Sequence, residues 1–242
     1  MASRQIVLDT ETTGLEPSQG HRIIEIGCVE LIDRKLTGNT FHQYINPESK
    51  KVDQGAFEVH GISNEFLEDK PFFADIYEEF LTFVKGAQLI IHNAPFDVGF
   101  LNNEIVLLEK KLGQSIKPID QQCQIVDSLK LARDMHPGQK NNLDALCRRY
   151  FIDNSNRQLH GALLDSEILA DVYLAMTGGQ IGLVLDDASE EGANTEEIRA
   201  LDKNRQSTLI QYATQEELKM HEEYLDMLEK KSGNPPLWRT IS

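Results

Sequence analysis

The sequence has little positive charge and no long apolar run. Its 242 residues include 24 lysines and arginines against 39 aspartates and glutamates, so the formal net charge is -15. This balance argues against a protein that binds nucleic acid through its overall charge. It permits a nuclease in which bound metal ions neutralise the acidic residues of the active site. A hydrophobic content of 40% is enough for one large domain, with or without an appendage.

Cysteine is also scarce. Cys28, Cys123 and Cys147 show no Cys-x-x-Cys spacing, which indicates reduced thiols that pack in the core rather than a disulfide framework. No apolar run approaches the length of a transmembrane helix. Strand-like sequence begins at about Arg4, which leaves no room for an apolar signal core. The expected location is therefore the cytoplasm.

Hydrophobic periodicity predicts an α/β domain with a mixed β-sheet flanked by helices. The first three strands, Arg4–Asp9, Arg22–Leu31 and Thr40–Ile45, are expected to form an antiparallel meander with links at 16–20 and 33–39. Two short apolar strands are expected later, at Gln88–His92 and Cys123–Val126. Helices are predicted at Val52–His60, Phe72–Val84, Asn93–Leu112, Asn142–Tyr150 and Gly161–Met176, with a further helix capped by Asp127 or Ser128.

The C-terminal quarter differs in composition. Residues 186–206 are rich in acids and poor in large apolar residues, which predicts a flexible linker. Apolar residues return in 207–242, with a predicted helix at Gln215–Lys231 and the only tryptophan, Trp238. This tail is too short to build its own core, so we interpret it as a docking segment that folds on a partner. A tail without function is the alternative.

Two carboxylates, Asp9 and Glu11, stand at the end of the first strand. Alternate residues of a strand share a face, so both side chains point the same way. Two acids held that close repel each other, and one takes up a proton unless a cation lies between them. A divalent metal is the natural cation for oxygen ligands. An acidic turn after an edge strand fits this stretch alone equally well.

Three further residues lie at element ends. Asp97 is at the start of a helix just after a buried strand, where α/β sheets gather ligands. His160 precedes the last helix of the domain, and Asp165 lies one turn into it, on the buried side. Taken alone, Asp97 is explained better as an acid in the first turn of a helix, where the helix dipole favours a negative charge. An unpaired Asp165 would cost several kcal/mol, a conflict that a metal relieves.

Together these residues predict a phosphoryl-transfer site. Two divalent cations, Mg²⁺ or Mn²⁺, would activate water and stabilise the leaving oxygen. Histidine, with an unperturbed pKa of about 6.5, can remove a proton from that water. The residues form the patterns Asp-x-Glu-Thr-Thr-Gly, His-Asn-Ala-Pro-Phe-Asp and His-x4-Asp. Each pattern is weak alone, whereas the set is specific.

With that set assembled, the chain resembles the DEDD-type 3′–5′ exonucleases of the histidine subclass, which have a ribonuclease H-like fold. It is similar in particular to the epsilon proofreading subunits of bacterial DNA polymerase III. The stretches that carry this resemblance are Arg4–Gly14, Ile23–Gly27, Val59–Ile62, His92–Leu101, Asn142–Tyr150, Leu159–Asp165 and Val172–Gln180. The resemblance implies a nuclease domain at 1–180 that removes mispaired nucleotides from DNA 3′ ends.

The resemblance also implies a role for each residue. Asp9, Glu11, Asp97 and Asp165 would hold two metal ions, and Asp9 would bridge both. His160 would be the general base, and His60 would contact the terminal nucleotide beside Asp9, Glu11 and Asp165. Gly55 occupies a place where the family has a carboxylate that touches substrate, which puts that contact in doubt. His92 and Asn93 would either support the metal ligands or form a core pair.

Partners are implied as well. Gln180, Leu183 and Leu185, in the segment 180–185, fit a sliding-clamp-binding motif. The tail 207–242 would bind the polymerase III alpha subunit, and a small theta-like subunit would dock on the nuclease domain. An exoribonuclease of the same fold and a scaffold between clamp and polymerase are the alternatives. The long tail argues against the first, and the carboxylates are unexplained by the second.

Overall fold

The computed structural model describes residues 4–157, 159–178 and 213–240. Gln180, Leu183, Leu185 and the expected linker 186–206 lie outside this range. The chain divides into two compact units, Met1–Leu185 and Asp186–Ser242, which are described separately. Within the described residues, no helix combines the length and apolar character that a membrane crossing requires.

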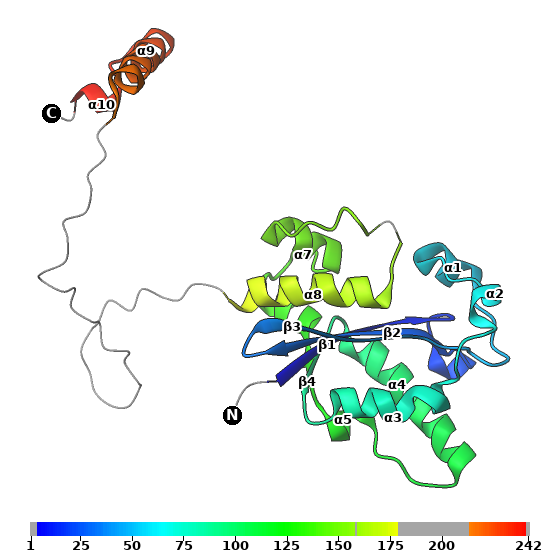
Figure 1. Ribbon diagram of the computed structural model, residues 1–242. Coiled ribbons are helices and arrows are strands. Elements are labelled where there is room, and N and C mark those ends of the chain that lie inside the picture. The colour runs from blue at the N-terminus through cyan, green and yellow to red at the C-terminus, as the bar shows by residue number, and fades with distance from the viewer. Residues whose placement is uncertain (1–3, 158, 179–212, 241–242) are drawn as a thin grey trace, which may run out of the picture. The chain divides into compact units, whose positions relative to one another are not determined.

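A five-stranded mixed sheet forms the middle layer of the first unit, in the order β3-β2-β1-β4-β5 (Figure 1). β1 pairs antiparallel with β2, and β2 with β3, whereas β4 runs parallel to β1, and β5 parallel to β4. The predicted meander and mixed sheet are therefore confirmed. The strands are β1 (Arg4–Thr12), β2 (Ile23–Ile32), β3 (Lys35–Tyr44), β4 (Gln88–Ile91) and β5 (Gln124–Asp127).

The link between β2 and β3 is much shorter than the predicted 33–39. Ile32 pairs with Lys35, so only Asp33 and Arg34 form the turn, both with positive φ angles of 48° and 63°. A two-residue turn of this kind matches the right-handed twist of a hairpin. The polar residues after it belong to the exposed edge strand β3, where no apolar alternation is needed. This explains why the sequence pattern predicted only the second half of β3, from Thr40 onward.

Helices cover both faces of the sheet, as predicted (Figure 1). α3, α4 and α5 pack on one face, where Ile6 and Leu8 of β1 meet Phe80 and Phe100. α7 and α8 pack on the other face, where Val7 belongs to a second core cluster. The helices are η1 (Pro17–Gln19), α1 (Gln54–His60), α2 (Asn64–Leu67), α3 (Phe73–Val84), α4 (Ala94–Leu112), α5 (Ile119–Gln122), α6 (Ser128–Met135), α7 (Leu143–Tyr150) and α8 (Ala162–Thr177). The sequence did not predict η1, α2 and α5, which are too short to show periodicity.

One glycine lets α8 approach the sheet closely. Gly27 of β2 pairs with Asp9 of β1, and a Cβ atom at Gly27 would lie 2.2 Å from the backbone of Ala162 and of Leu163. The Ser166 hydroxyl donates a hydrogen bond to the Gly27 carbonyl at 2.9 Å. The first turn of α8 is thereby fixed beside the middle of β1.

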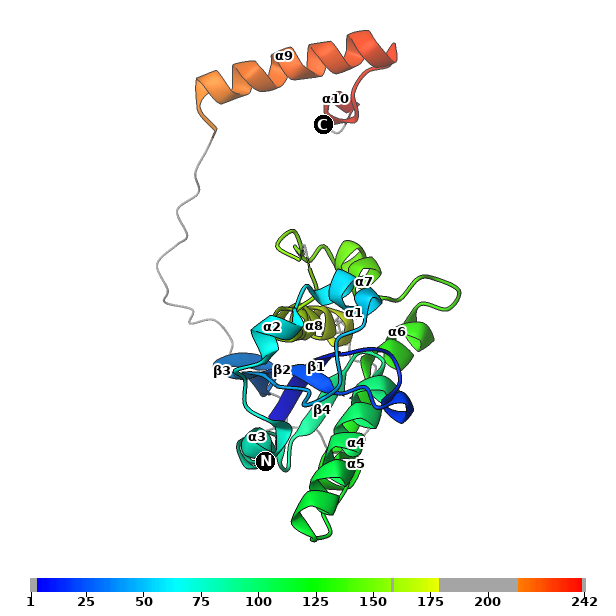
Figure 2. The ribbon, with the colours of Figure 1, turned by 90° about the vertical axis from the view of Figure 1, so that its right-hand side faces the viewer.

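The second unit contains α9 (Gln215–Ser232) and α10 (Leu237–Thr240), which lie side by side (Figure 2). Thr214 and Glu217 form a capping box that begins α9, and the predicted helix is confirmed. Leu225 is buried. Arg239 of α10 donates hydrogen bonds of 2.7 Å to three carboxylates of α9, those of Glu222, Asp226 and Glu229.

Candidate active site

The five residues predicted to form the site lie together. They line a cavity of about 260 Å³ with Thr10, His92, Phe96, Asn142, Asp144 and Arg157, among others. The cavity lies at the carboxyl end of β1, next to the parallel strand β4, from which the chain continues into α4. Ligand sites of α/β sheets gather at such strand ends, so the sheet brings residues far apart in sequence to one place.

Asp9 and Glu11 occupy alternate positions of β1, which extends three residues beyond the predicted end at Asp9. A bulge follows Glu11, whose partner on β2 is Glu25. Burial and the neighbouring carboxylates, chiefly Asp97 for Asp9 and Asp165 for Glu11, raise both pKa values. The pKa of Glu11 rises to about 8. Near neutral pH, this cluster therefore favours either bound protons or a cation.

Asp97 reaches the cavity from the first turn of α4. The helix begins after Asn93, which has a left-handed φ of 71°, and carries Pro95 in its first turn, where proline is tolerated. The Asp97 carboxylate is buried and accepts a hydrogen bond of 2.7 Å from the Thr10 hydroxyl. Burial raises the pKa of Asp97 to about 7, although the Thr10 hydrogen bond opposes the shift.

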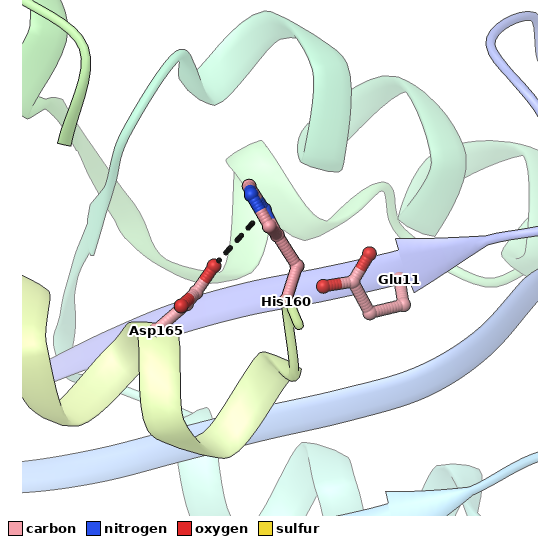
Figure 3. A group of neighbouring side chains, drawn as sticks. All are labelled: Glu11, His160 and Asp165. Carbon is pink, nitrogen blue, oxygen red and sulfur yellow. Dashed lines mark ion pairs between the residues drawn. The ribbon is translucent and has the colours of Figure 1, made fainter. Parts of the chain in front are cut away.

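Asp165 and His160 reach the cavity from the start of α8. Asp165 is buried in the first turn of α8, whereas His160 lies on the preceding loop, as predicted. The His160 backbone N–H donates to the Val59 carbonyl at 3.0 Å, which ties this loop to α1. Figure 3 shows Asp165 and His160 beside Glu11, with 3.4 Å between His160 Nδ1 and Asp165 Oδ2. One ligand atom of each residue lies within 4.8 Å of the others, and such oxygen and nitrogen donors fit a divalent metal.

Arg157 is a residue of this site that the sequence argument missed. Its guanidinium donates to both oxygens of Asp165, at 2.5 and 2.7 Å, and to Asp144 at 2.8 Å. The burial of Asp165 therefore does not by itself require a metal, because the Arg157 guanidinium already neutralises its charge. The sequence did offer one indication of this role. Arg157 is the single basic residue between Arg149 and His160, and it lies close in sequence to the buried Asp165.

A second cavity, of about 390 Å³, adjoins the first and shares Thr10, Glu11 and Phe96 with it. His60, the last residue of α1, lines it and accepts a hydrogen bond on Nδ1 from the Ile62 backbone. Its Nε2 is buried and has no hydrogen-bond partner among the described residues. Gly55 also lines this cavity, with open space where a Cβ atom would be. The expected contact of His60 with the terminal nucleotide stays a prediction, and so does the doubt about a substrate contact at Gly55.

His92 and Asn93 have different surroundings in the structure. His92 lines the first cavity, and its Nδ1 lies 3.0 Å from the Ser128 hydroxyl, which donates to the Ile91 carbonyl. Asn93 is instead the residue before α4, and its backbone N–H donates to Asp127. The two residues therefore do not form a core pair.

Comparison with known proteins places this site in a family. A family model described as "Exonuclease" matches residues 6–173. The DNA polymerase III subunit epsilon of Salmonella typhimurium is 50% identical over 243 residues, which covers 98% of this chain and 98% of the relative. The subunit of the same name from Escherichia coli is 48% identical with the same coverage. That from Haemophilus influenzae is 51% identical over 98% of this chain and 94% of its own.

Solved structures agree on the fold. Exonuclease X, in complex with 5′ overhanging duplex DNA, is 26% identical with a TM-score of 0.55, covering 72% of this chain and 91% of its own. The nuclease domain of 3′hExo, a DEDDh family member bound to rAMP, is 19% identical with a TM-score of 0.60, covering 73% and 92%. The predicted ribonuclease H-like fold is confirmed. The chain belongs to the exonuclease family and, within it, to the epsilon subunits of DNA polymerase III.

Proposed function

We propose that the four carboxylates and His160 form a two-cation site for hydrolysis of the last phosphodiester bond of a DNA strand. The chain is a proofreading 3′–5′ exonuclease by family, and this family depends on divalent metal ions. Asp9, Glu11, Asp97 and Asp165 would hold two ions, Mg²⁺ or Mn²⁺, with Asp9 shared between them. Bound there, the ions would supply Lewis acidity to the phosphate oxygens.

The observation that carries this proposal is the convergence of buried carboxylates with raised pKa values. Asp9, Glu11 and Asp97 stand within one cavity and repel each other as anions. Folding such groups together is unfavourable unless protons or cations neutralise them. Carboxylates with a purely structural role at the end of a sheet need not be buried close together. A metal-dependent nuclease needs them close together, because they bind its ions.

His160 is proposed as the general base. Its side chain is half exposed on a loop, so it can reach water in the cavity. Burial, followed by the charge of Arg157, lowers its pKa. A neutral imidazole near neutral pH is the form that accepts a proton.

The second cavity is proposed to hold the terminal nucleotide. Its wall is mostly apolar, with Leu15, Val59 and Phe96 beside the buried His60, and it opens directly at Glu11. An apolar pocket beside the carboxylates suits an unpaired base better than a paired one, which must first be separated from its complement. This predicts a preference for frayed or mispaired 3′ ends.

Partners would supply the affinity for DNA that a net charge of -15 does not. We propose that the tail 207–242 binds the polymerase alpha subunit, because α9 and α10 leave Met220, Tyr224 and Trp238 exposed. Gln180, Leu183 and Leu185 are proposed to bind the sliding clamp, and a theta-like subunit would dock on the nuclease domain. Gel filtration with the alpha subunit, comparing the full chain with one that ends at residue 206, tests the role of the tail.

The decisive experiment is a nuclease assay on mispaired and paired primer-template DNA with and without Mg²⁺. The wild-type chain should degrade the mispaired end faster, and only with Mg²⁺, whereas Asp9→Ala should be inactive. Hydrolysis that survives in the double variant Asp9→Ala with Glu11→Ala would contradict the assignment and favour a scaffold. Faster turnover on matched RNA single strands than on DNA would favour an exoribonuclease.

A further inference from the structure

Arg157 contacts three groups of the active site at once. Nε and one terminal nitrogen donate to the two oxygens of Asp165, and the other terminal nitrogen donates to Asp144. The nitrogen that reaches Asp165 Oδ2 also lies 2.9 Å from His160 Nδ1. The Arg157 side chain is only 7% exposed, so these charge-assisted contacts are shielded from water and strong.

This contact fixes the state of His160. A guanidinium has donors only, so His160 Nδ1 must accept its hydrogen bond, and the ring proton of the neutral imidazole then lies on Nε2. The Nδ1 lone pair is occupied, and Nε2 already carries a proton. While Arg157 stays in place, His160 therefore has no free nitrogen with which to remove a proton from water.

The same guanidinium also pairs with the carboxylate of Asp165. Both carboxylate oxygens accept from it in a bidentate fork, although Asp165 also belongs to the group of ligand atoms with Glu11 and His160. A cation and a guanidinium compete for the same oxygens of a buried carboxylate. Asp144 offers a second anchor for Arg157, because it lies in the first turn of α7 and its side chain is 43% exposed.

We propose that Arg157 is a latch that holds the active site in a resting state and that a divalent cation must displace from Asp165. Displacement frees a metal ligand and His160 Nδ1 together, while Asp144 keeps Arg157 in the cavity. Arg157 is a positioning residue in this scheme. The inference rests on the proposed function, because it takes Asp165 as a metal ligand and His160 as the base.

Mn²⁺ binding tests the competition without any nuclease assay. Free Mn²⁺ is counted by electron paramagnetic resonance, at one fixed pH and without DNA, for the full-length wild type and for Arg157→Gln. Removing the competing guanidinium should lower the dissociation constant about tenfold, the effect of one hydrogen bond to a charged group. A residue with only a structural role would, when lost, leave Mn²⁺ binding unchanged or weaken it, and either result overturns the latch.

Arg148→Gln is the matched control, since it removes the same charge from an exposed position on α7. Its Mn²⁺ affinity should stay close to that of the wild type. An equal gain in both variants would mean that net charge, rather than the fork on Asp165, limits binding, and would overturn the latch.

A second measurement covers the case in which Arg157→Gln fails to fold. The Arg157 Nε–H signal in a proton–nitrogen spectrum of the wild type is assigned by its loss in Arg157→Lys. It should shift during a Mg²⁺ titration, over the same concentrations at which Mg²⁺ binds. A signal that stays fixed while Mg²⁺ binds overturns the latch alone. A wild-type chain that binds neither Mg²⁺ nor Mn²⁺ overturns the proposed function as well.

Discussion

Two arginines of this chain have similar partners in very different surroundings. Arg157 bonds Asp144 and Asp165, and Arg239 bonds Glu222, Asp226 and Glu229, all at 2.5–2.8 Å. The side chain of Asp165 is 5% exposed and that of Asp226 is 68% exposed. Water and salt screen the exposed cluster, while the buried pair interacts strongly. Burial, rather than the number of partners, decides which ion pair can control a reaction.

The carboxylates of the two units differ in the same way. Burial and repulsion raise the pKa of Glu11 to about 8. In the tail, hydrogen bonds from Thr214 lower the pKa of Glu217, which is exposed at the start of α9. An acid at a helix start is stable as an anion, whereas an acid in the cavity needs a counter-charge. An exposed acid such as Glu217 therefore caps a helix, whereas a buried acid such as Glu11 is suited to binding a cation.

The largest effect should come from Asp9→Asn. This change keeps the size of the side chain but removes a charge that the cations need, and we expect activity to fall at least about a thousandfold. The variant should fold as well as the wild type, because the repulsion inside the cavity decreases. Asp226→Asn is the control, since the same change in the exposed cluster should leave nuclease activity unchanged. A nuclease assay with circular dichroism measures both, and an active Asp9→Asn would contradict the prediction.

Gly27→Ala should have the next largest effect. The added Cβ atom would collide with the backbone at the start of α8, so we expect a loss of about 2 kcal/mol in the free energy of unfolding. Mn²⁺ binding should weaken, because Asp165 moves with α8. Gly55→Ala adds the same methyl group in open space within α1 and should be neutral or slightly stabilising. Urea denaturation measures both, and equal stability of the two variants would refute the packing argument.

Without divalent cations, stability should fall as pH rises from about 7 to about 8.5. Glu11 keeps its proton in the folded state up to about pH 8, whereas the unfolded chain has already lost it, so the folded state binds more protons in this window. The expected loss is on the order of 1 kcal/mol. The window lies above the range in which His60, His92 and His160, whose pKa values are lowered, contribute with the opposite sign.

Urea denaturation in the presence of a chelator measures this dependence, and Mg²⁺ should reverse the loss at the higher pH. Glu11→Gln is the control and should make the profile less steep, since glutamine does not titrate, whereas Asp9, whose pKa is also raised, still does. A free energy of unfolding that rises over this window would show that Glu11 is not a buried acid with a raised pKa.

The smallest effect should come from Arg239→Gln, which removes three contacts at once. Because all three partners are exposed, we expect only a slight loss of helical signal in the tail and none in the nuclease unit. Circular dichroism at low and high salt checks this. A large loss of helix would show that α9 depends on α10. The exposed ion pairs of Arg239 would then matter more than their exposure predicts, contrary to the contrast drawn with Arg157.

The sequence was sufficient to predict a mixed sheet with an antiparallel meander, though not the order of its strands, and to single out the five residues that line the cavity. Strand alternation, the turn after Glu11 and the helix starts at Asp97 and Asp165 are local features that appear in the pattern. Arg157 was missed because its role depends on a loop folding back on α8, which no periodicity records. The turn at Asp33 and Arg34 was missed because neither residue is the glycine or asparagine that usually marks such a turn.

The three buried cysteines have a practical consequence. Cys28, Cys123 and Cys147 are at most 6% exposed, and burial raises the pKa of each thiol. Thiol-directed dyes attack accessible thiolates, so the native protein should react slowly with them. A single cysteine placed at the exposed position Lys219 of α9 can therefore carry a fluorophore or spin label in an otherwise unaltered chain. The mobility of the tail then becomes measurable from the anisotropy of the fluorophore or from the line shape of the spin label.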